Sequence, residues 1–298
     1  MNKKVLAHIL AIVLMIIWGL SYLSIKVIVG EIEPTLSAFY RFFIAFIFLA
    51  IVYKSKYSHE KVLKEDKIRL AMGGLFGITL YFFFENYSVY FTSASNVAIL
   101  ISTIPVFTLL VQAVIYKENM TISKVLGVIL SLVGIIIVVA TKDRVNLFSK
   151  GSLGDIMVLG AVISWVIYNV FSSKFKGNYS SATISTYQTF WGCLFLSPSL
   201  FFSKVAIPSS TVILNIIFLS LICSCIGSIL YIYCLKNLGA TVISTYINLQ
   251  PIVSLISASI LLKEAVTKWQ VIGCIVIILG VFLVSFGDKI VAEKIKNL

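Results

Sequence analysis

The sequence predicts an all-α integral membrane protein whose ten transmembrane helices form two inverted five-helix repeats. Two observations carry this prediction. The chain of 298 residues is 59% hydrophobic and only 12% charged, and that charged share is about half of what a globular domain carries. In addition, the second half of the sequence repeats the first at a constant spacing, which indicates a duplicated unit.

The composition also excludes several classes of function. The five cysteines are scattered through apolar segments without a CxxC pair, and His8 and His59 are isolated. Without a glycine-rich phosphate loop either, we expect no disulfide framework, no metal and no cofactor. The net charge of +12 lies mainly between the apolar runs, where basic residues set membrane orientation. We therefore expect the lipid bilayer, and not nucleic acid, as the partner of these charges.

Ten apolar runs are each long enough to cross a bilayer. They cover approximately residues 5–29, 35–53, 69–90, 92–115, 122–141, 153–174, 181–202, 211–234, 241–262 and 268–287. With a cytoplasmic N-terminus, sixteen of the 24 Lys and Arg fall in cytoplasmic segments and six in outer ones. The positive-inside rule then predicts a multi-pass protein of the cytoplasmic membrane with both termini in the cytoplasm.

The repeat divides the chain into residues 1–145 and 146–298. Seven residues recur 146 positions later; Ala94, Pro105, Lys117, Glu118, Thr121, Gly127 and Gly134 match Ala240, Pro251, Lys263, Glu264, Thr267, Gly273 and Gly280. Near the start of the two halves the spacing is 147, which aligns Trp18 with Trp165. Because each unit has five crossings, an odd number, the second unit must lie upside down relative to the first.

The repeated residues have definite physical roles. Pro105 and Pro251 interrupt apolar runs, so we expect each to kink a transmembrane helix. The pair Gly127 and Gly134 is two turns apart on one helix face, and its repeat copy is too, so other helices can approach closely there. Thr267 precedes Gln270 by three residues, which predicts a capping box. The glycines and threonines are also explained by packing alone.

Three charged residues fall inside apolar runs: Lys26, Arg41 and Glu85. A charge in the hydrocarbon costs a few kcal/mol, so it has a partner or a function. All three lie at a similar predicted depth, and we expect them to form one cluster. It is either an ion-pair cluster closing the outer side of the first half, or a site where Glu85 binds a substrate amine or carries a coupling proton.

Further polar and aromatic residues are candidates for lining a substrate cavity. Amides beside a broken helix can bind a polar solute, and these are Asn86, Asn96, Asn248 and Gln250; hydrogen bonding between helices is the alternative. The aromatic candidates are Trp18, Tyr22, Tyr81, Trp165, Tyr168 and Tyr246. Trp18 and Trp165 lie in mid-helix and not at the membrane interface, which suits cavity lining as well as ordinary packing.

The ordered set of motifs resembles the drug/metabolite transporter superfamily, in its ten-helix EamA branch. The matching residues are Trp18-Gly19, Lys26, Arg41-Phe42, the run from Thr92 to Pro105, Lys117-Glu118 and the glycine pair, with their counterparts in the second half. The resemblance covers essentially the whole chain and implies a cavity between two halves and export of small metabolites, often amino acids. The second half departs from the first, because Gln188 replaces Arg41 and Tyr231 replaces Glu85.

We therefore predict a secondary or facilitated transporter of small organic metabolites that works by alternating access, with protons as a possible coupling ion. It would not be an enzyme, because a lipid-modifying enzyme needs a surface cluster of carboxylates or histidines, and only scattered ones are present. The remaining alternative is a receptor or assembly protein that does not transport. The sequence leaves the substrate and the oligomeric state open.

Overall fold

The computed structural model describes residues 2–91, 97, 100–117, 120–140, 152–203, 208–253, 256 and 267–296. In these residues every regular element is a helix. The first half holds α1 (Lys3–Val29), α2 (Pro34–Val52), η1 (Tyr53–Tyr57), α3 (Lys64–Gly74), η2 (Leu75–Leu80), α4 (Tyr81–Phe91), α6 (Ile104–Tyr116) and α7 (Ile122–Ala140). The second half holds α8 (Ser152–Ser173), α9 (Ser181–Leu196), α10 (Ser199–Phe202), α11 (Ser210–Phe218), η3 (Leu219–Ile226), α12 (Gly227–Leu238), α13 (Ala240–Tyr246), η4 (Ile247–Leu249) and α15 (Lys268–Lys296).

Six continuous helical stretches of the described chain are long and apolar enough to cross a membrane. They are Lys3–Val29, Pro34–Tyr57, Lys64–Phe91, Ile156–Ser173, Ser210–Leu238 and Lys268–Asp288, and two shorter apolar helices cover Ile104–Tyr116 and Ile122–Ile137. The chain is thus a multi-pass membrane protein. Ten crossings stay a prediction, because parts of the predicted runs 92–115 and 241–262 lie outside the described residues.

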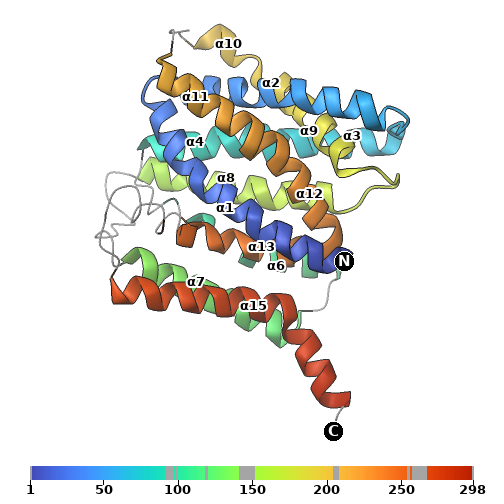
Figure 1. Cartoon of the computed structure of the whole chain (residues 1–298), viewed down its shortest axis with the longest axis vertical. Coiled ribbons are helices and arrows are strands. Elements are labelled where there is room, and N and C mark those ends of the chain that lie inside the picture. Colours follow the sequence, from blue (N-terminus) through green and yellow to red (C-terminus); the bar gives the residue numbers. More distant parts are fainter. Residues whose placement is uncertain are drawn as a thin grey trace.

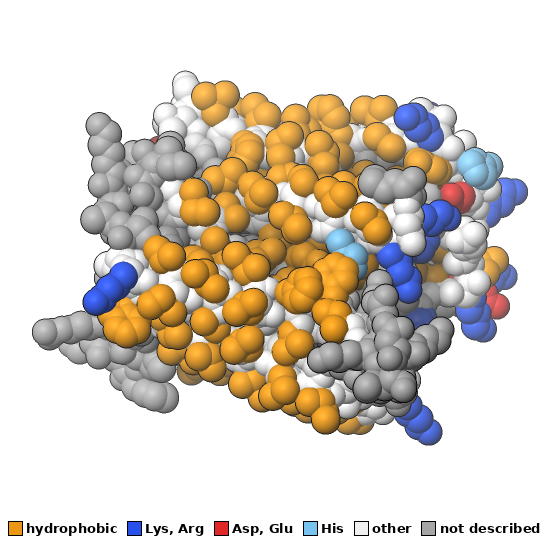
Figure 2. All heavy atoms as spheres, turned by 60° about the horizontal axis from the view of Figure 1, so that its bottom comes forward, with side chains coloured by type: hydrophobic (Ala, Val, Ile, Leu, Met, Phe, Trp, Pro, Cys, Tyr) orange, Lys and Arg blue, Asp and Glu red, His pale blue; other side chains and the backbone are white. Residues whose placement is uncertain are grey.

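Most helices lie roughly parallel or antiparallel to one another, with α7 and α15 as a closely packed pair at one edge (Figure 1). Hydrophobic side chains form a broad band across the face shown in Figure 2, while most Lys and Arg side chains gather at one end. That end, which carries residues 54–69, is called the Lys-rich end below. A band of apolar surface between polar ends is what a bilayer requires.

The predicted glycine faces hold α7 and α15 together, which confirms close helix approach at these residues. A Cβ added to Gly127 would lie 2.7 Å from the carbonyl oxygen of Gly280, and one added to Gly134 would lie 2.7 Å from that of Gly273. A Cβ added to Gly280 would in turn lie 2.6 Å from the carbonyl oxygen of Gly127. The backbones therefore touch directly, and the two helices run antiparallel.

Several helices begin with a side-chain cap, one of which the sequence analysis predicted. Thr267 and Gln270 form the predicted capping box, since the Gln270 side chain accepts from the Thr267 amide at 2.8 Å and the Thr267 hydroxyl accepts from the Gln270 amide at 3.3 Å. Ser180 caps α9 and Ser209 caps α11 in the same manner. These caps satisfy amides that a helix cannot satisfy itself.

The third apolar run of each half contains a π-helical segment that the sequence analysis did not predict. In the first half η2 follows α3, and in the second half η3 follows α11. Shifted by the repeat spacing of 146, the residues of η2 fall within η3. A π-helical turn locally widens a helix and is frequent at functional sites, so the two segments mark equivalent places in the two halves.

The two helices with repeated prolines are also irregular next to those prolines. Residues 102–103 form a turn before α6, in which Pro105 occupies the first turn. In the second half η4, a single 3-10 turn, joins α13 to the residues that begin at Gln250 and Pro251. Both interruptions come two to four residues before the proline, where its ring opposes a regular α-helix.

At the Lys-rich end, carboxylates of the first half bind a loop of the second half. The Asp66 carboxylate accepts from the backbone amides of Lys176 at 3.0 Å and Gly177 at 2.9 Å, and from the Tyr179 hydroxyl at 2.9 Å. Glu60 accepts from the amide of Ser180 at 2.8 Å. These contacts join residues 60–66, which lead from α2 into the first turn of α3, to residues 176–180, which lead into α9. They are called the connection at the Lys-rich end below.

A counterpart stands at the opposite end. Here Glu31 accepts from the amide and the hydroxyl of Ser209 at 2.9 and 2.8 Å, and Glu33 accepts from the Ser203 hydroxyl at 3.0 Å. As at the Lys-rich end, a carboxylate of the first half binds the cap of a helix in the second half. The two halves are thus joined by hydrogen bonds at both ends of the molecule.

Candidate functional site

Two adjoining cavities lie between the halves. The larger has a volume of about 440 Å³ and the smaller about 300 Å³, including space that is open to solvent. Both are bordered by Trp18, Arg41, Phe82 and Trp165. The larger cavity is also lined by Phe42, Gly77, Ile78, Tyr168, Ser185, Gln188, Thr189, Cys223, Ser224, Ser228 and Tyr231. The smaller is also lined by Ser21, Tyr22, Tyr81, Glu85 and Gln250. Since both halves contribute walls, the site requires the two units together.

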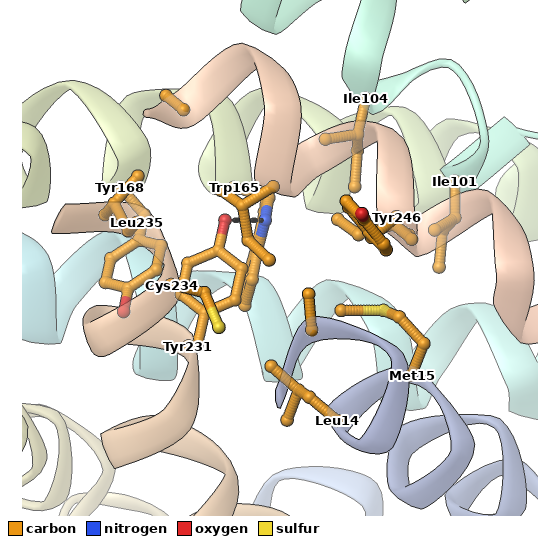
Figure 3. Packing of buried hydrophobic residues seen from close by; sticks show 14 of the residues in the cluster. Leu14, Met15, Ile101, Ile104, Trp165, Tyr168, Tyr231, Cys234, Leu235 and Tyr246 are labelled. Carbon is orange, nitrogen blue, oxygen red and sulfur yellow. Dashed lines mark hydrogen bonds between the residues drawn. The ribbon is translucent and has the colours of Figure 1, made fainter. Parts of the chain in front are cut away.

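Aromatic rings from both halves pack together beside the cavities, and two of them, Trp18 and Trp165, line both. The Trp18 ring meets the Trp165 ring edge to face with centroids 5.6 Å apart and stacks on Tyr231 at 5.5 Å. The Trp165 indole donates to the Tyr231 hydroxyl at 3.1 Å, which donates to Asn169 at 2.6 Å; Figure 3 shows the first of these bonds. The ring of Tyr168 also stacks on Tyr231. Such edge and stacked contacts fix the rings rigidly.

Arg41 is the cation of the site. Its side chain is buried, and its Nε donates to the Ser224 hydroxyl of η3 at 2.6 Å. The guanidinium carbon lies 4.5 Å from the centroid of the Phe82 ring, a cation-π contact. A second ring, that of Phe42, lies 5.3 Å from the guanidinium carbon. Arg41 lines both cavities, and a guanidinium has five N–H donors, of which the bond to Ser224 uses one.

Glu85 is the carboxyl group of the site, and it is incompletely satisfied. Its side chain is 4% exposed. Oε1 accepts from the Tyr81 hydroxyl at 2.9 Å, whereas Oε2 is buried without a hydrogen-bond partner. A buried carboxylate oxygen without a donor costs free energy, so the site is arranged to receive a donor there.

The predicted cluster of three charges is only partly assembled. Arg41 and Glu85 border the same cavity, but Lys26 lies in the last turn of α1 and is exposed. A lysine within a turn of the helix end can extend its amine to the interface instead of burying it. The structure therefore places Arg41 and Glu85 at the same cavity and leaves Lys26 apart.

Of the predicted amides, Gln250 alone borders a cavity among the described residues; its Oε1 accepts from the Tyr22 hydroxyl at 3.2 Å. The other two described amides join helices. Asn86 donates to the carbonyl of Pro34 at 2.9 Å, and Asn248 donates to the Ser131 hydroxyl at 2.8 Å. Asn96 lies outside the described residues.

The aromatic candidates divide in the same way. Trp18, Tyr22, Tyr81, Trp165 and Tyr168 border the cavities. Tyr246 belongs to the same hydrophobic cluster as Trp165 but lies on the side of Met15, Ile101 and Ile104 (Figure 3), lines neither cavity, and has its hydroxyl 2.7 Å from Nδ1 of His8. Pro105 and Pro251 lie in the irregular helices described above and do not line either cavity.

The cavity residues that the sequence analysis did not name as candidates include Gln188, Tyr231, Phe82 and Ser224. Two of them carried a usable signal. Gln188 occupies the repeat position of Arg41, and Tyr231 occupies that of Glu85, so the repeat alone points to both. Phe82 and Ser224 have no comparable sequence signal, because their role depends on contact with Arg41. In the part of the chain that the structure describes, no three His, Cys, Asp or Glu side chains converge as metal ligands would.

Comparison with known proteins gives two matches to one family model along the chain. The model of the EamA-like transporter family matches residues 5–140 and again residues 152–286. An uncharacterized transporter of Archaeoglobus fulgidus is 31% identical over 96% of this chain and 98% of its own length. A probable amino-acid metabolite efflux pump of Escherichia coli strain K12 is 26% identical over 94% of each chain.

A solved crystal structure has the same fold. It superposes with a TM-score of 0.78 over 95% of this chain and 96% of its own, at 17% sequence identity. Fold is all that a likeness at this identity shows.

Proposed function

The chain belongs to the EamA-like transporter family, and from this premise we propose that it exports small polar solutes of the amino-acid type by alternating access. That it is a transporter follows from the family and from relatives named as transporters. The solute class is supported by the name of the efflux pump of Escherichia coli and by the chemistry of the cavity. We also propose that both termini lie in the cytoplasm and that the protein lies in the cytoplasmic membrane, which the distribution of Lys and Arg along the sequence supports.

One observation carries the choice of solute. Oε2 of Glu85 is buried, borders the cavity and has no hydrogen-bond partner. The ammonium group of an amino acid or amine supplies the missing donor in charge-assisted form. Arg41 borders the same cavity and offers its guanidinium to a carboxylate. Trp18 and Trp165 provide apolar walls for the remainder of the solute.

The contacts of α7 with α15 support the inverted repeat. Gly127 and Gly273 are repeat partners, as are Gly134 and Gly280. The observed pairs are Gly127 with Gly280 and Gly134 with Gly273, so each contact becomes the other when the repeat units are exchanged. Reciprocal contacts of this kind are expected when a two-fold axis relates the two units. Because α7 and α15 are antiparallel, that axis must be perpendicular to the helices. The units 1–145 and 146–298 are then inverted relative to each other.

Inverted units offer two states of similar free energy, each open to one side of the membrane. The segments suited to bending are the ones with irregular helix geometry: η2 and η3 beside the cavity, and the turns before Pro105 and Pro251. Such defects absorb changes of direction at low cost. The hydrogen bonds at the two ends would open in alternation.

Solute exchange by the purified protein in liposomes tests the proposal. We expect amino acids preloaded into the liposomes to drive saturable uptake of labelled amino acids. Nucleosides, and amines without a carboxylate, are tested in the same assay for comparison. A pH gradient across the liposome shows whether protons are coupled. Absence of exchange for every solute by well-folded protein would favour the alternative of a receptor or assembly protein that does not transport.

Variants of one residue test the site. Glu85→Gln keeps the shape but removes the charge, and we expect the rate of exchange to fall about tenfold or more, since a charge-assisted bond is lost. Glu65→Gln is the matched control, because Glu65 is exposed near the start of α3. Equal exchange by both variants would contradict a role for Glu85 in binding.

A further inference from the structure

A third cavity, separate from the central ones, opens at the end opposite the Lys-rich end. Its volume is about 880 Å³ including space that is open to solvent, and it shares no residue with the central cavities. It lies among the start of α2, the segment η2 to α4, and the end of α9 with α10. Its walls are Glu33, Thr35, Thr79, Leu80, Phe83, Tyr87, Phe195, Leu196, Pro198, Ser199, Phe202 and Ser203. We call it the lateral groove.

The lateral groove changes from polar to apolar along its length. At one end the Glu33 carboxylate accepts from the hydroxyls of Tyr87 at 2.5 Å and Ser203 at 3.0 Å. Towards the other end the walls are mainly Leu80, Phe83 and Phe195. Tyr87 and Thr79 are eight residues apart, which is about 12 Å along a helix. A lipid has the same arrangement, with a polar head group at one end and an apolar chain at the other.

The groove lies where α9 and α4 are hardly in contact. α9 packs on α2, α3 and η2 instead. Beyond it, α10 lies at the edge of the molecule (Figure 1) and exposes Phe201 at 86% and Phe202 at 89%. Exposed phenylalanines of this kind suit lipid contact and not water. The occupant of the groove is therefore drawn from the membrane.

The polar end has one charge and one unsatisfied hydroxyl. Ser199 is 8% exposed, lines the groove, and its Oγ has no hydrogen-bond partner. Burial raises the pKa of Glu33, but hydrogen bonds from Tyr87, the amides of Thr35 and Leu36, and Ser203 outweigh it and leave that pKa below its ordinary value. Glu33 is thus an anion at neutral pH, while no Lys or Arg is among the described residues of the groove.

We propose that the lateral groove binds one amine-headed phospholipid, phosphatidylethanolamine, from the adjacent leaflet. Its ammonium group pairs with Glu33, its phosphate accepts from the Ser199 hydroxyl, and one acyl chain lies along Leu80, Phe83 and Phe195. A phospholipid with an anionic, amine-free head lacks the cation for Glu33. This site is independent of the transport site, since it shares no wall with it.

Native mass spectrometry of the delipidated full chain in detergent tests the proposal. Phosphatidylethanolamine and phosphatidylglycerol with identical acyl chains are titrated separately. We expect the wild-type protein to bind one phosphatidylethanolamine about tenfold more tightly, as one charge-assisted bond allows. Equal affinity for the two lipids would overturn the proposal without any variant.

Variants locate the bound lipid. Glu33→Gln keeps the acceptor that caps α2 but should abolish the preference between the lipids, whereas Glu31→Gln, two residues away and outside the groove, should preserve it. Leu80→Trp fills the apolar end and should weaken both lipids at least fivefold. Leu194→Trp is its control, because Leu194 is 48% exposed and does not line the groove. Unchanged binding by Leu80→Trp, or a preference retained in Glu33→Gln, would place the lipid elsewhere and overturn the proposal.

Discussion

The two halves of the chain share their backbone features but differ in the side chains that face the cavity. Both halves have the glycine pair, the proline after a helix irregularity, a π-helical segment and a central tryptophan. At the cavity the first half presents Arg41 and Glu85, and the second half presents Gln188 and Tyr231 at the corresponding positions. Duplication has preserved the parts that shape the helices, while the charges exist on one side only.

This difference separates residues that determine helix packing from residues that determine solute binding. Repeated glycines and prolines determine how helices approach and bend, which both halves need equally. The charged pair determines what is bound, and a single solute needs it once. We therefore expect variants of repeated residues to have equal effects in the two halves, and variants of cavity residues to have unequal ones.

The largest effect should come from the glycine interface. A side chain at Gly280 would lie 2.5 Å from the Ser131 amide, and one at its repeat partner Gly134 would lie 2.7 Å from the Gly273 carbonyl, so α7 and α15 must separate. We expect Gly134→Ala and Gly280→Ala each to cost about 1–3 kcal/mol of stability. The midpoints of thermal unfolding in detergent measure this. Gly30→Ala is the control, since its nearest neighbour is 3.4 Å away. A large cost in one variant only would argue against equivalent halves.

The next effect concerns the unequal cavity residues. Arg41→Gln gives the first half the residue of the second, and exchange of amino acids in liposomes should fall about tenfold because the cation for the solute carboxylate is lost. Gln188→Ala should change the rate by less than threefold, since the Gln188 amide donates to Ser172 of its own half. Similar losses in both variants would remove the distinction between the halves.

A moderate effect is expected at the Lys-rich end. Asp66 is buried and accepts three hydrogen bonds. Asp66→Asn replaces a carboxylate by an amide, which is a weaker acceptor for the amides of residues 176 and 177 and for the Tyr179 hydroxyl. We expect the free energy of unfolding to fall by about 1–3 kcal/mol. The neighbouring Glu65→Gln should have no measurable effect, because Glu65 is exposed. Equal stability of the two variants would show that the connection does not stabilise the fold.

Acid should weaken the same connection. Burial raises the pKa of Glu60, but hydrogen bonds from the Thr183 hydroxyl and from Ser180 outweigh it and lower that pKa below its ordinary value. A carboxylate with a lowered pKa stabilises above its unfolded pKa, and the contribution is lost as the pH falls through its folded pKa. Protection of the Ser180 amide in hydrogen exchange, corrected for the intrinsic rate, should therefore decrease in acid. Glu60→Gln should remove this pH dependence, and its persistence would assign the effect to another group.

The smallest effect is expected for Lys26, which is exposed and apart from the cavity. Lys26→Ala should change the rate of exchange by less than twofold. A loss as large as that of Arg41→Gln would show that Lys26 joins the cavity in another state of the transporter.

Helical membrane architecture could be predicted from composition, and the packing of α7 on α15 from the spacing of its glycines. The capping box of Thr267 and Gln270 was equally readable, since it depends on residues three apart. The π-helical segments were not, because Leu75–Leu80 is as apolar as its neighbours and its hydrogen-bond pattern depends on the helices around it. Burial of Arg41 and exposure of Lys26 depend in the same way on which neighbours each helix meets, and hydropathy along the chain does not contain that information.

The connection at the Lys-rich end also has an evolutionary consequence. Asp66 reaches the loop after α8 through the backbone amides of residues 176 and 177, and every residue except proline has such an amide. The side chain of Lys176 is therefore free to change without loss of these bonds. Descendants of this chain can alter the basic residues that orient the protein in its membrane while Asp66 keeps the two halves joined. The same freedom makes residue 176 a suitable place for a spectroscopic label.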